Sequence, residues 1–159
     1  MFSTFPFFKW CDEIWIARAI RASVVAFPVI ETFHLFALTL LFGAIIFLTL
    51  RLCGLTMKHQ PASKVAQDLA PWILGSLLTM LLTGFLLFVS EALRCYSSPP
   101  FWFKMGFLFS AITFHYTVVR RITRPEKAGL TPFRAKLAGV INLILWISIG
   151  LGGRAIAFL

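Results

Sequence analysis

The chain has 159 residues, of which 59% are hydrophobic and 13% charged, and its mean hydropathy is +0.87. A soluble domain has about 45–50% apolar and about 25% charged residues, so the composition excludes an ordinary soluble protein and indicates a multi-pass membrane protein. The formal net charge of +9 does not indicate nucleic-acid binding, because the basic residues cluster at the ends of apolar runs, as membrane topology requires.

The first predicted element is a short helix over residues 12–23. Asp12 and Glu13 stand in its first turn, and Arg18 and Arg21 follow, an order that suits the dipole of a helix. These charges argue against a segment that crosses the hydrocarbon core. We therefore expect an interfacial helix that lies in the headgroup layer.

Four apolar runs follow, each long enough to cross a bilayer. In the first, the 19 positions from Thr32 to Leu50 carry no formal charge and make a helix of about 28 Å, close to the ~30 Å hydrocarbon core. The predicted fold is all-α: an integral membrane antiparallel four-helix bundle preceded by the interfacial helix, as one domain over residues 1–159. The spans are expected at about residues 29–50, 70–90, 101–119 and 137–153.

The Lys and Arg residues are shared unevenly between the two sides that this topology creates. Because loops rich in Lys and Arg stay in the cytoplasm, we expect a cell inner membrane protein with both termini on the periplasmic, outer side. The inner side holds nine: Arg51, Lys58, Lys64, Arg120, Arg121, Arg124, Lys127, Arg134 and Lys136. The outer side holds six: Lys9, Arg18, Arg21, Arg94, Lys104 and Arg154.

Two histidines lie within the spans, His34 in the first and His115 in the third, which suggests one haem ligated from both sides. Such ligation needs both imidazoles at one depth. His34 is about 25 Å from the inner boundary at Arg51, whereas His115 is about 7 Å from the boundary at Arg120. The mismatch of roughly 18 Å excludes a shared iron. We interpret His115 as a hydrogen-bonded bundle residue rather than a ligand.

The same measure of depth brings a polar residue from every span to one outer layer. Glu31, His34, Glu91, Lys104 and Arg154 all lie about 24–30 Å from the inner boundary of their spans. Ionisable groups near the hydrocarbon tend to face the bundle interior and to be paired or functional. The layer is therefore either a polar pocket open to the outer face or a set of interfacial anchors whose side chains reach the headgroups.

Three chemistries remain open for a pocket in this layer. Glu31, His34 and Glu91 could ligate a transition metal through one imidazole and two carboxylates. Alternatively, His34 could be the lone axial ligand of haem b, with Lys104 and Arg154 pairing the propionates. In the third, His34 relays protons between the two carboxylates.

The chain has three cysteines. In the predicted topology Cys11 and Cys95 both face the outer side, and Cys53 lies at the inner end of the first span. A disulfide between Cys11 and Cys95 is compatible with an oxidising compartment. The alternative, which we favour, is that both are free interfacial thiols.

Five short motifs are spread over nearly the whole chain: FP-x-x-E-x-x-H at Phe27–His34, Arg51-Leu52-x-Gly54-Leu55, SEALRCY at Ser90–Tyr96, FWFK at Phe101–Lys104 and GRAIAF at Gly153–Phe158. Together they resemble a group of bacterial four-span proteins, domain of unknown function 6644. More distantly, the histidine in a Leu- and Gly-rich first span is similar to CopD-type copper-resistance proteins and HemJ-type protoporphyrinogen oxidases. The closer resemblance implies a four-span fold and no activity, and the distant one implies copper or haem.

Three functional hypotheses follow. The first is a small membrane protein that binds haem or a metal near the outer face for a redox or electron-transfer role. The second is a non-catalytic subunit or scaffold of a larger complex, in which the charged layer serves packing or docking. The third is a small proton-coupled transporter. The expected partners are the lipid bilayer and either a larger membrane complex or further copies of the chain, and not nucleic acid.

Overall fold

The computed structural model describes residues 5–124 and 132–158, and for residues 154–158 the backbone alone. Within these ranges every regular element is a helix and no strand is present, which confirms the all-α class. The elements are α1 (Phe5–Glu13), α2 (Trp15–Ala22), α3 (Ala26–Leu52), α4 (Ala62–Ser90), α5 (Ala92–Ser97), α6 (Pro99–Phe114), the π-helix η1 (His115–Val119), α7 (Arg120–Ile122) and α8 (Pro132–Phe158).

Three helices are long and apolar enough to cross a membrane: α3, α4 and the Pro132–Gly153 part of α8. Each contains one predicted span and extends beyond it. α4 begins at Ala62 rather than near residue 70, and its first turns are polar, with Lys64 Nζ 2.8 Å from Asp68 Oδ1. Hydropathy marks only the part of a helix that lies in hydrocarbon, so the predicted spans are shorter than the helices. The three long apolar helices indicate a membrane protein.

The third predicted span, at residues 101–119, corresponds to three consecutive helical elements. α6 has 16 residues and is short for a span by itself. Because η1 and α7 continue it directly, the helical segment from Pro99 to Ile122 is about 36 Å long. η1 is a π-turn, in which the backbone hydrogen bonds skip one residue more than in an α-helix.

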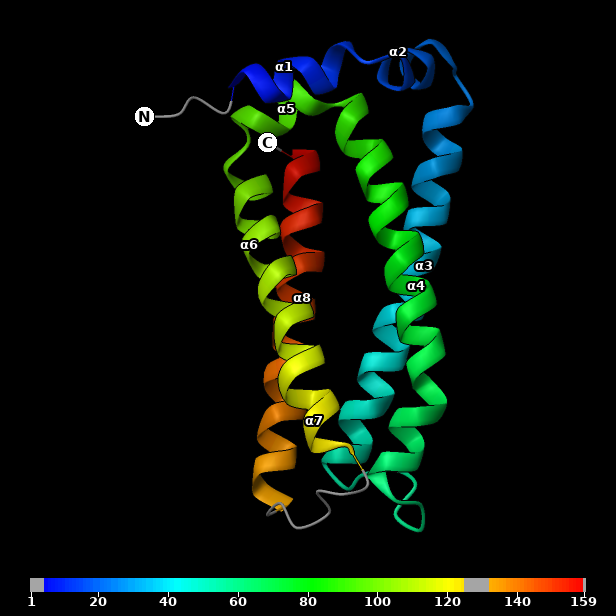
Figure 1. The fold of residues 1–159 in the computed structure, drawn as a ribbon, viewed down its shortest axis with the longest axis vertical. Coiled ribbons are helices and arrows are strands. Elements are labelled where there is room, and N and C mark those ends of the chain that lie inside the picture. The colour runs from blue at the N-terminus through cyan, green and yellow to red at the C-terminus, as the bar shows by residue number, and fades with distance from the viewer. Residues whose placement is uncertain (1–4, 125–131, 159) are drawn as a thin grey trace.

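The long helices pack as two pairs, α3 with α4 and α6 with α8, and α3 also packs against α8 (Figure 1). The main core lies between them and includes Leu41 and Ile45 of α3, Met80 of α4 and Trp146 of α8. Trp146 is 1% exposed. The end of α8 lies at the same end of the molecule as α1 and α5 (Figure 1).

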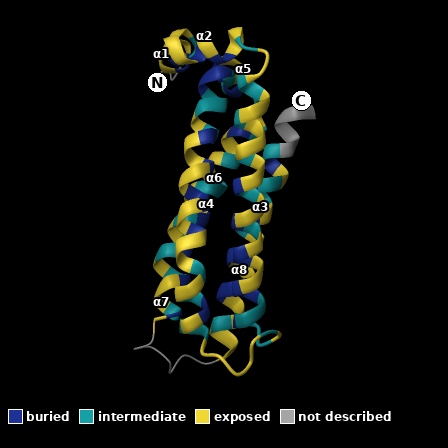
Figure 2. Ribbon diagram, turned by 90° about the vertical axis from the view of Figure 1, so that its right-hand side faces the viewer, coloured by how far each residue is buried: buried dark blue, intermediate teal, exposed yellow. Residues whose placement is uncertain are grey.

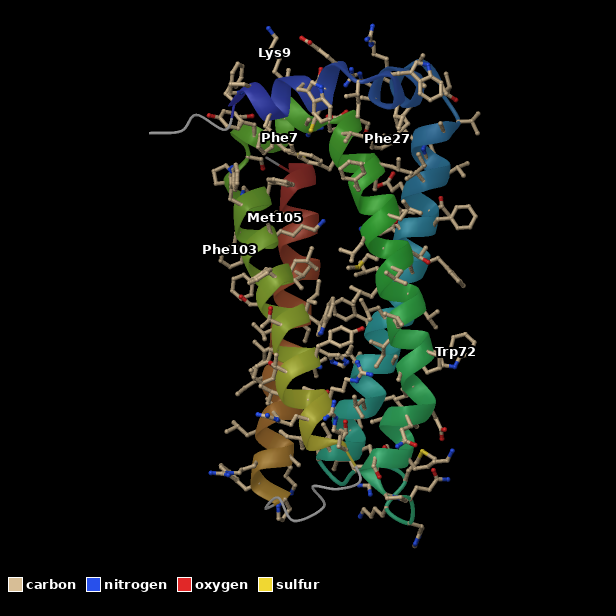
Figure 3. All side chains as sticks on the ribbon, viewed as in Figure 1. Phe7, Lys9, Phe27, Trp72, Phe103 and Met105 are labelled. Carbon is tan, nitrogen blue, oxygen red and sulfur yellow. The ribbon has the colours of Figure 1, made fainter. Side chains whose placement is uncertain are left out.

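Large apolar side chains cover the outside of the long helices. Exposed residues line their outward faces along almost the whole length, and buried residues face inward (Figure 2). Trp72 of α4 and Phe103 of α6 are 59% and 56% exposed and point away from the helices (Figure 3). Apolar surface of this extent is unusual for a soluble monomer and is what lipid requires.

The N-terminal segment forms two helices rather than the single helix predicted at 12–23. α1 begins at Phe5, and the chain is extended at Ile14 before α2 begins. The earlier start follows from burial: Phe8 packs its ring 5.5 Å from Phe88 and 5.2 Å from Tyr96, between ring centroids. α1 and α2 lie across the end of the long helices (Figure 1). α5 packs beneath α1, in the stretch between the second and third predicted spans.

The end of α3 is explained by its sequence. Gly54 has a φ of 75°, a conformation that costs little only for glycine. Its N–H donates to the Arg51 carbonyl at 3.0 Å, and the Leu55 N–H donates to the Leu50 carbonyl at 2.9 Å. This pair of bonds is the Schellman motif, which satisfies the last carbonyls of a helix.

Arg21 ties α2 to both α1 and α4. Its guanidinium donates to Asp12 Oδ1 at 2.9 Å, to the Asp12 carbonyl at 2.6 Å and to the Ser90 carbonyl at 3.1 Å. Because the group is partly exposed, we expect Arg21→Gln to lower the free energy of unfolding by only about 1 kcal/mol. Thermal unfolding in detergent would measure it. Arg18→Gln is the control, because Arg18 donates to the Glu13 carbonyl close by in the sequence. Equal losses of stability in the two variants would contradict a special role of Arg21 in holding α2 against α4.

Candidate functional site

His34 lies in the half of α3 nearer to α2, and its ring reaches α4. His34 Nδ1 is 3.0 Å from Thr83 Oγ1. The Thr83 hydroxyl donates its single hydrogen to the Thr79 carbonyl at 2.7 Å, so Oγ1 is left to accept from Nδ1–H. The imidazole also has a backbone hydrogen bond with Met80, one turn before Thr83 on α4. Assigned from the Thr83 network, the tautomer carries its hydrogen on Nδ1, and the lone pair is on Nε2.

The ring fits against α4 because residue 84 is glycine. A Cβ on Gly84 would lie 3.1 Å from His34 Cε1, closer than most real contacts. The ring is half-buried. Thr83 and Gly84 together set the position of the imidazole on α4.

Lys104 of α6 lies within electrostatic range of His34 and also of Cys95. Its side chain runs along α8: a Cβ on Gly152 would lie 3.4 Å from Lys104 Cβ, and one on Gly153 would lie 3.5 Å from Lys104 Nζ. The lysine side chain therefore packs beside both glycines of α8, where an added Cβ would meet it at ordinary van der Waals distance. The half-buried ammonium is a positive charge within the helix assembly.

The remaining residues of the predicted outer layer do not join this group in the structure. Glu31 is exposed, and Glu91 Oε2 lies 3.9 Å from Arg94 Nη1 at the start of α5. The side chain of Arg154 lies outside the described residues. Over residues 5–124 and 132–153, no three His, Cys, Asp or Glu side chains are placed to hold a metal ion. The structure thus brings His34 and Lys104 into range of each other, without the two carboxylates.

His115 lies far from His34 along the assembly. It opens η1 and lines a cavity together with Leu48, which follows His34 by 14 residues on α3, or about 21 Å. The structure thus agrees that the two histidines do not meet. His115 is buried, and its imidazole is within reach of a side-chain hydrogen bond with Asn142, while its Nδ1 has no partner among the described residues.

Cys11 and Cys95 are both buried and share one apolar cluster with Phe8 and Phe101. Both are free thiols in the structure, as is Cys53. Burial raises the pKa of Cys11 and of Cys95, and the negative charge of Glu91 raises the pKa of Cys95 further. The thiolate, which is the reactive form, is therefore disfavoured at neutral pH in both. A disulfide between them stays a prediction.

Comparison with known families agrees with the sequence motifs. The sequence model of a family described as "Family of unknown function (DUF6644)" matches residues 7–159. The chain belongs to DUF6644. No curated protein and no solved structure matches it significantly, and the distant likeness to CopD-type and HemJ-type proteins is not shown by these comparisons. Membership in DUF6644 establishes the family without assigning an activity.

Sequence reasoning missed two polar side chains of this DUF6644 protein. Thr83 follows Thr79 by one helical turn within an apolar run, a spacing that puts both on one face of α4. Asn142 is buried in α8 in an otherwise apolar stretch. A polar residue in such a run commonly faces the interior of a membrane protein, so both could have been noted as inward-facing.

Proposed function

We propose that this DUF6644 chain is a cell inner membrane protein with four spans in antiparallel order. The continuous helical segment from Pro99 to Ile122 supports a fourth crossing, in addition to α3, α4 and α8. The common location of α1 and the end of α8 supports an even number of crossings (Figure 1). The excess of Lys and Arg in the other two loops supports a cytoplasmic location for those loops, with both termini outside.

We further propose that the protein binds haem b, with His34 as the single axial ligand, and serves a redox role. The hydrogen bond between His34 Nδ1 and Thr83 Oγ1 is the observation that carries this proposal. A histidine that ligates a metal through one nitrogen nearly always donates the N–H of the other to an oxygen, which fixes the tautomer. His34 has this arrangement, and its Nε2 is left with a lone pair.

The donor set favours haem over a bare metal ion. A metal centre built from side chains needs several ligands, and the described residues offer no group of three. Haem needs only one protein nitrogen, because the porphyrin supplies four. Lys104 would pair with a propionate through a charge-assisted hydrogen bond. Arg154 would pair with the other propionate, as its position in the sequence suggests.

When bound, the haem supplies a one-electron carrier, and the protein tunes it. Thr83 would hold the His34 ring in one orientation, and its hydrogen bond would raise the basicity of Nε2. The apolar faces of the helices would exclude water from the site. The positive charge of Lys104 would favour the reduced form, which carries one more electron.

Absorption spectra of protein purified from cells supplied with haem test this assignment. We expect a Soret band that His34→Ala abolishes and that His115→Ala retains. Thr83→Val should keep the band and weaken haem affinity by about 10–100-fold. Loss of the band in His115→Ala with retention in His34→Ala would reverse the assignment. A protein without haem in every preparation would instead favour a non-catalytic subunit of a larger complex.

A further inference from the structure

A second polar site lies at the other end of the helix assembly, beside the π-turn. A partly open cavity of about 90 Å³ lies between α3, α4, η1 and α7. One wall is apolar, formed by α3 and α4. The other carries His115, Tyr116, Arg120 and Thr123. The volume is well above the ~15 Å³ that one water molecule needs, and several polar groups surround it.

Polar atoms without partners gather at this cavity and directly behind it. His115 is 7% exposed and Asn142 1%, and the two side chains are within reach of a hydrogen bond with each other. Within the described part of the chain, however, His115 Nδ1, Asn142 Oδ1 and Trp146 Nε1 have no partner at full hydrogen-bond geometry. Asn142 and Trp146 are four residues apart on α8 and so share one face.

Buried polar atoms in a membrane protein are almost always satisfied, because the bilayer offers no alternative partner. Of these three residues His115 lines the cavity, so a water molecule there can donate to its Nδ1 or accept from it. Asn142 and Trp146 lie on α8, outside the cavity lining. π-turns of this kind are frequent at functional sites. Here the π-turn begins at His115 and directs its ring to the cavity.

We propose that this cavity is a hydrated proton-binding site, in which His115 exchanges a proton with water at the end of the molecule opposite to α1 and α2. The transferred proton moves between a water oxygen and a ring nitrogen of His115, with no electron transfer. Arg120, which is exposed and lies with its Cζ 5.9 Å from the centroid of the Tyr116 ring, stands at the mouth. The site is independent of His34 and of haem.

The charged groups around the cavity leave His115 as its titrating residue. Arg120, on the same helical segment, acts electrostatically on the imidazole. On α4, Lys64 and Asp68 pair with each other at the surface. On α3, Arg51 donates to the Gln60 carbonyl in the following loop. On the described part of α8, Asn142 faces the ring and is neutral.

Ring-nitrogen NMR of the full chain in lipid nanodiscs, with ¹⁵N-labelled histidine, tests the proposal. The chain has three histidines, so His34→Gln and His59→Gln assign the signals. We expect the His115 ring signals to shift as the pH is lowered and to exchange with water protons. Ring signals that do not change with pH and do not exchange with water would overturn the proposal.

A cavity-filling variant tests whether water reaches the His115 ring through the cavity. Ala66 lines the cavity, and Ala66→Leu should abolish the exchange between the His115 ring and water. Ala19→Leu, at an exposed position of α2, is the matched control and should leave the exchange unchanged. If Ala66→Leu does not fold, Ala70→Leu fills the same cavity from a more exposed position. Unchanged exchange in a folded cavity-filling variant would contradict the proposal.

Discussion

Trp146→Ala is expected to cause the largest loss of stability of any single substitution considered for this protein. Trp146 is 1% exposed and packs in the main core with Leu41 and Ile45. Truncation leaves a cavity that neighbouring helices fill only in part. Because lipid is itself apolar, the transfer contribution is smaller than in water, and the lost packing dominates. We expect the free energy of unfolding to fall by about 3 kcal/mol.

Trp72→Ala provides the matched control, since it removes the same side chain from a surface position. Trp72 is 59% exposed and points away from the helices (Figure 3). Its loss should change the free energy of unfolding by no more than about 0.5 kcal/mol. Denaturant titration in mixed micelles measures both variants. Equal losses would mean that Trp146 does not occupy the core between the helix pairs.

Gly139→Leu is the second substitution with a large expected effect, because it acts at the contact between α3 and α8. A Cβ on Gly139 would lie 3.3 Å from both Cβ and Cδ1 of Leu52 and 3.5 Å from Thr49 Cγ2. The contact also includes a bond from Thr49 Oγ1 to the Gly139 carbonyl at 3.2 Å. A leucine would force the helices apart, and we expect a loss of about 2–3 kcal/mol in the free energy of unfolding.

Gly43→Leu makes the same chemical change where space is open. A Cβ on Gly43 would meet nothing within 4 Å. Leucine is also the better helix former, by somewhat under 1 kcal/mol. Gly43→Leu should therefore leave stability unchanged or raise it slightly, in the same micelle titration. A loss in Gly43→Leu as large as that in Gly139→Leu would show that any glycine replacement is harmful, whatever its surroundings.

The sequence predicted the apolar centres of the long helices well and their ends poorly. Charge-free runs report the thickness of hydrocarbon, so the spans beginning near residues 29 and 137 fall inside α3 and α8. The early start of α4 and the division between α1 and α2 depend on contacts outside the hydrocarbon. Phe8, for example, is helical because it packs on Phe88 and Tyr96. Such contacts cannot be read from hydropathy.

For the candidate site, counting residues estimates depth along a helix but not rotation about its axis. It put His34 and Lys104 in one layer, and in the structure the two are within electrostatic range of each other. It also included Glu31 and Glu91, which do not join His34 in a ligating group among the described residues. The face of a helix that turns inward depends on its neighbours. The partnership of His34 with Thr83, and the π-turn at His115, therefore required the structure.

The visible absorption spectrum of the wild-type protein, purified from membranes of cells supplied with haem, tests the central claim most directly. The proposal predicts a Soret band with one haem b per chain, and uptake of added haemin by any haem-free fraction. A colourless protein that takes up no haemin, while remaining folded and helical by circular dichroism, would contradict the assignment of His34 as a haem ligand.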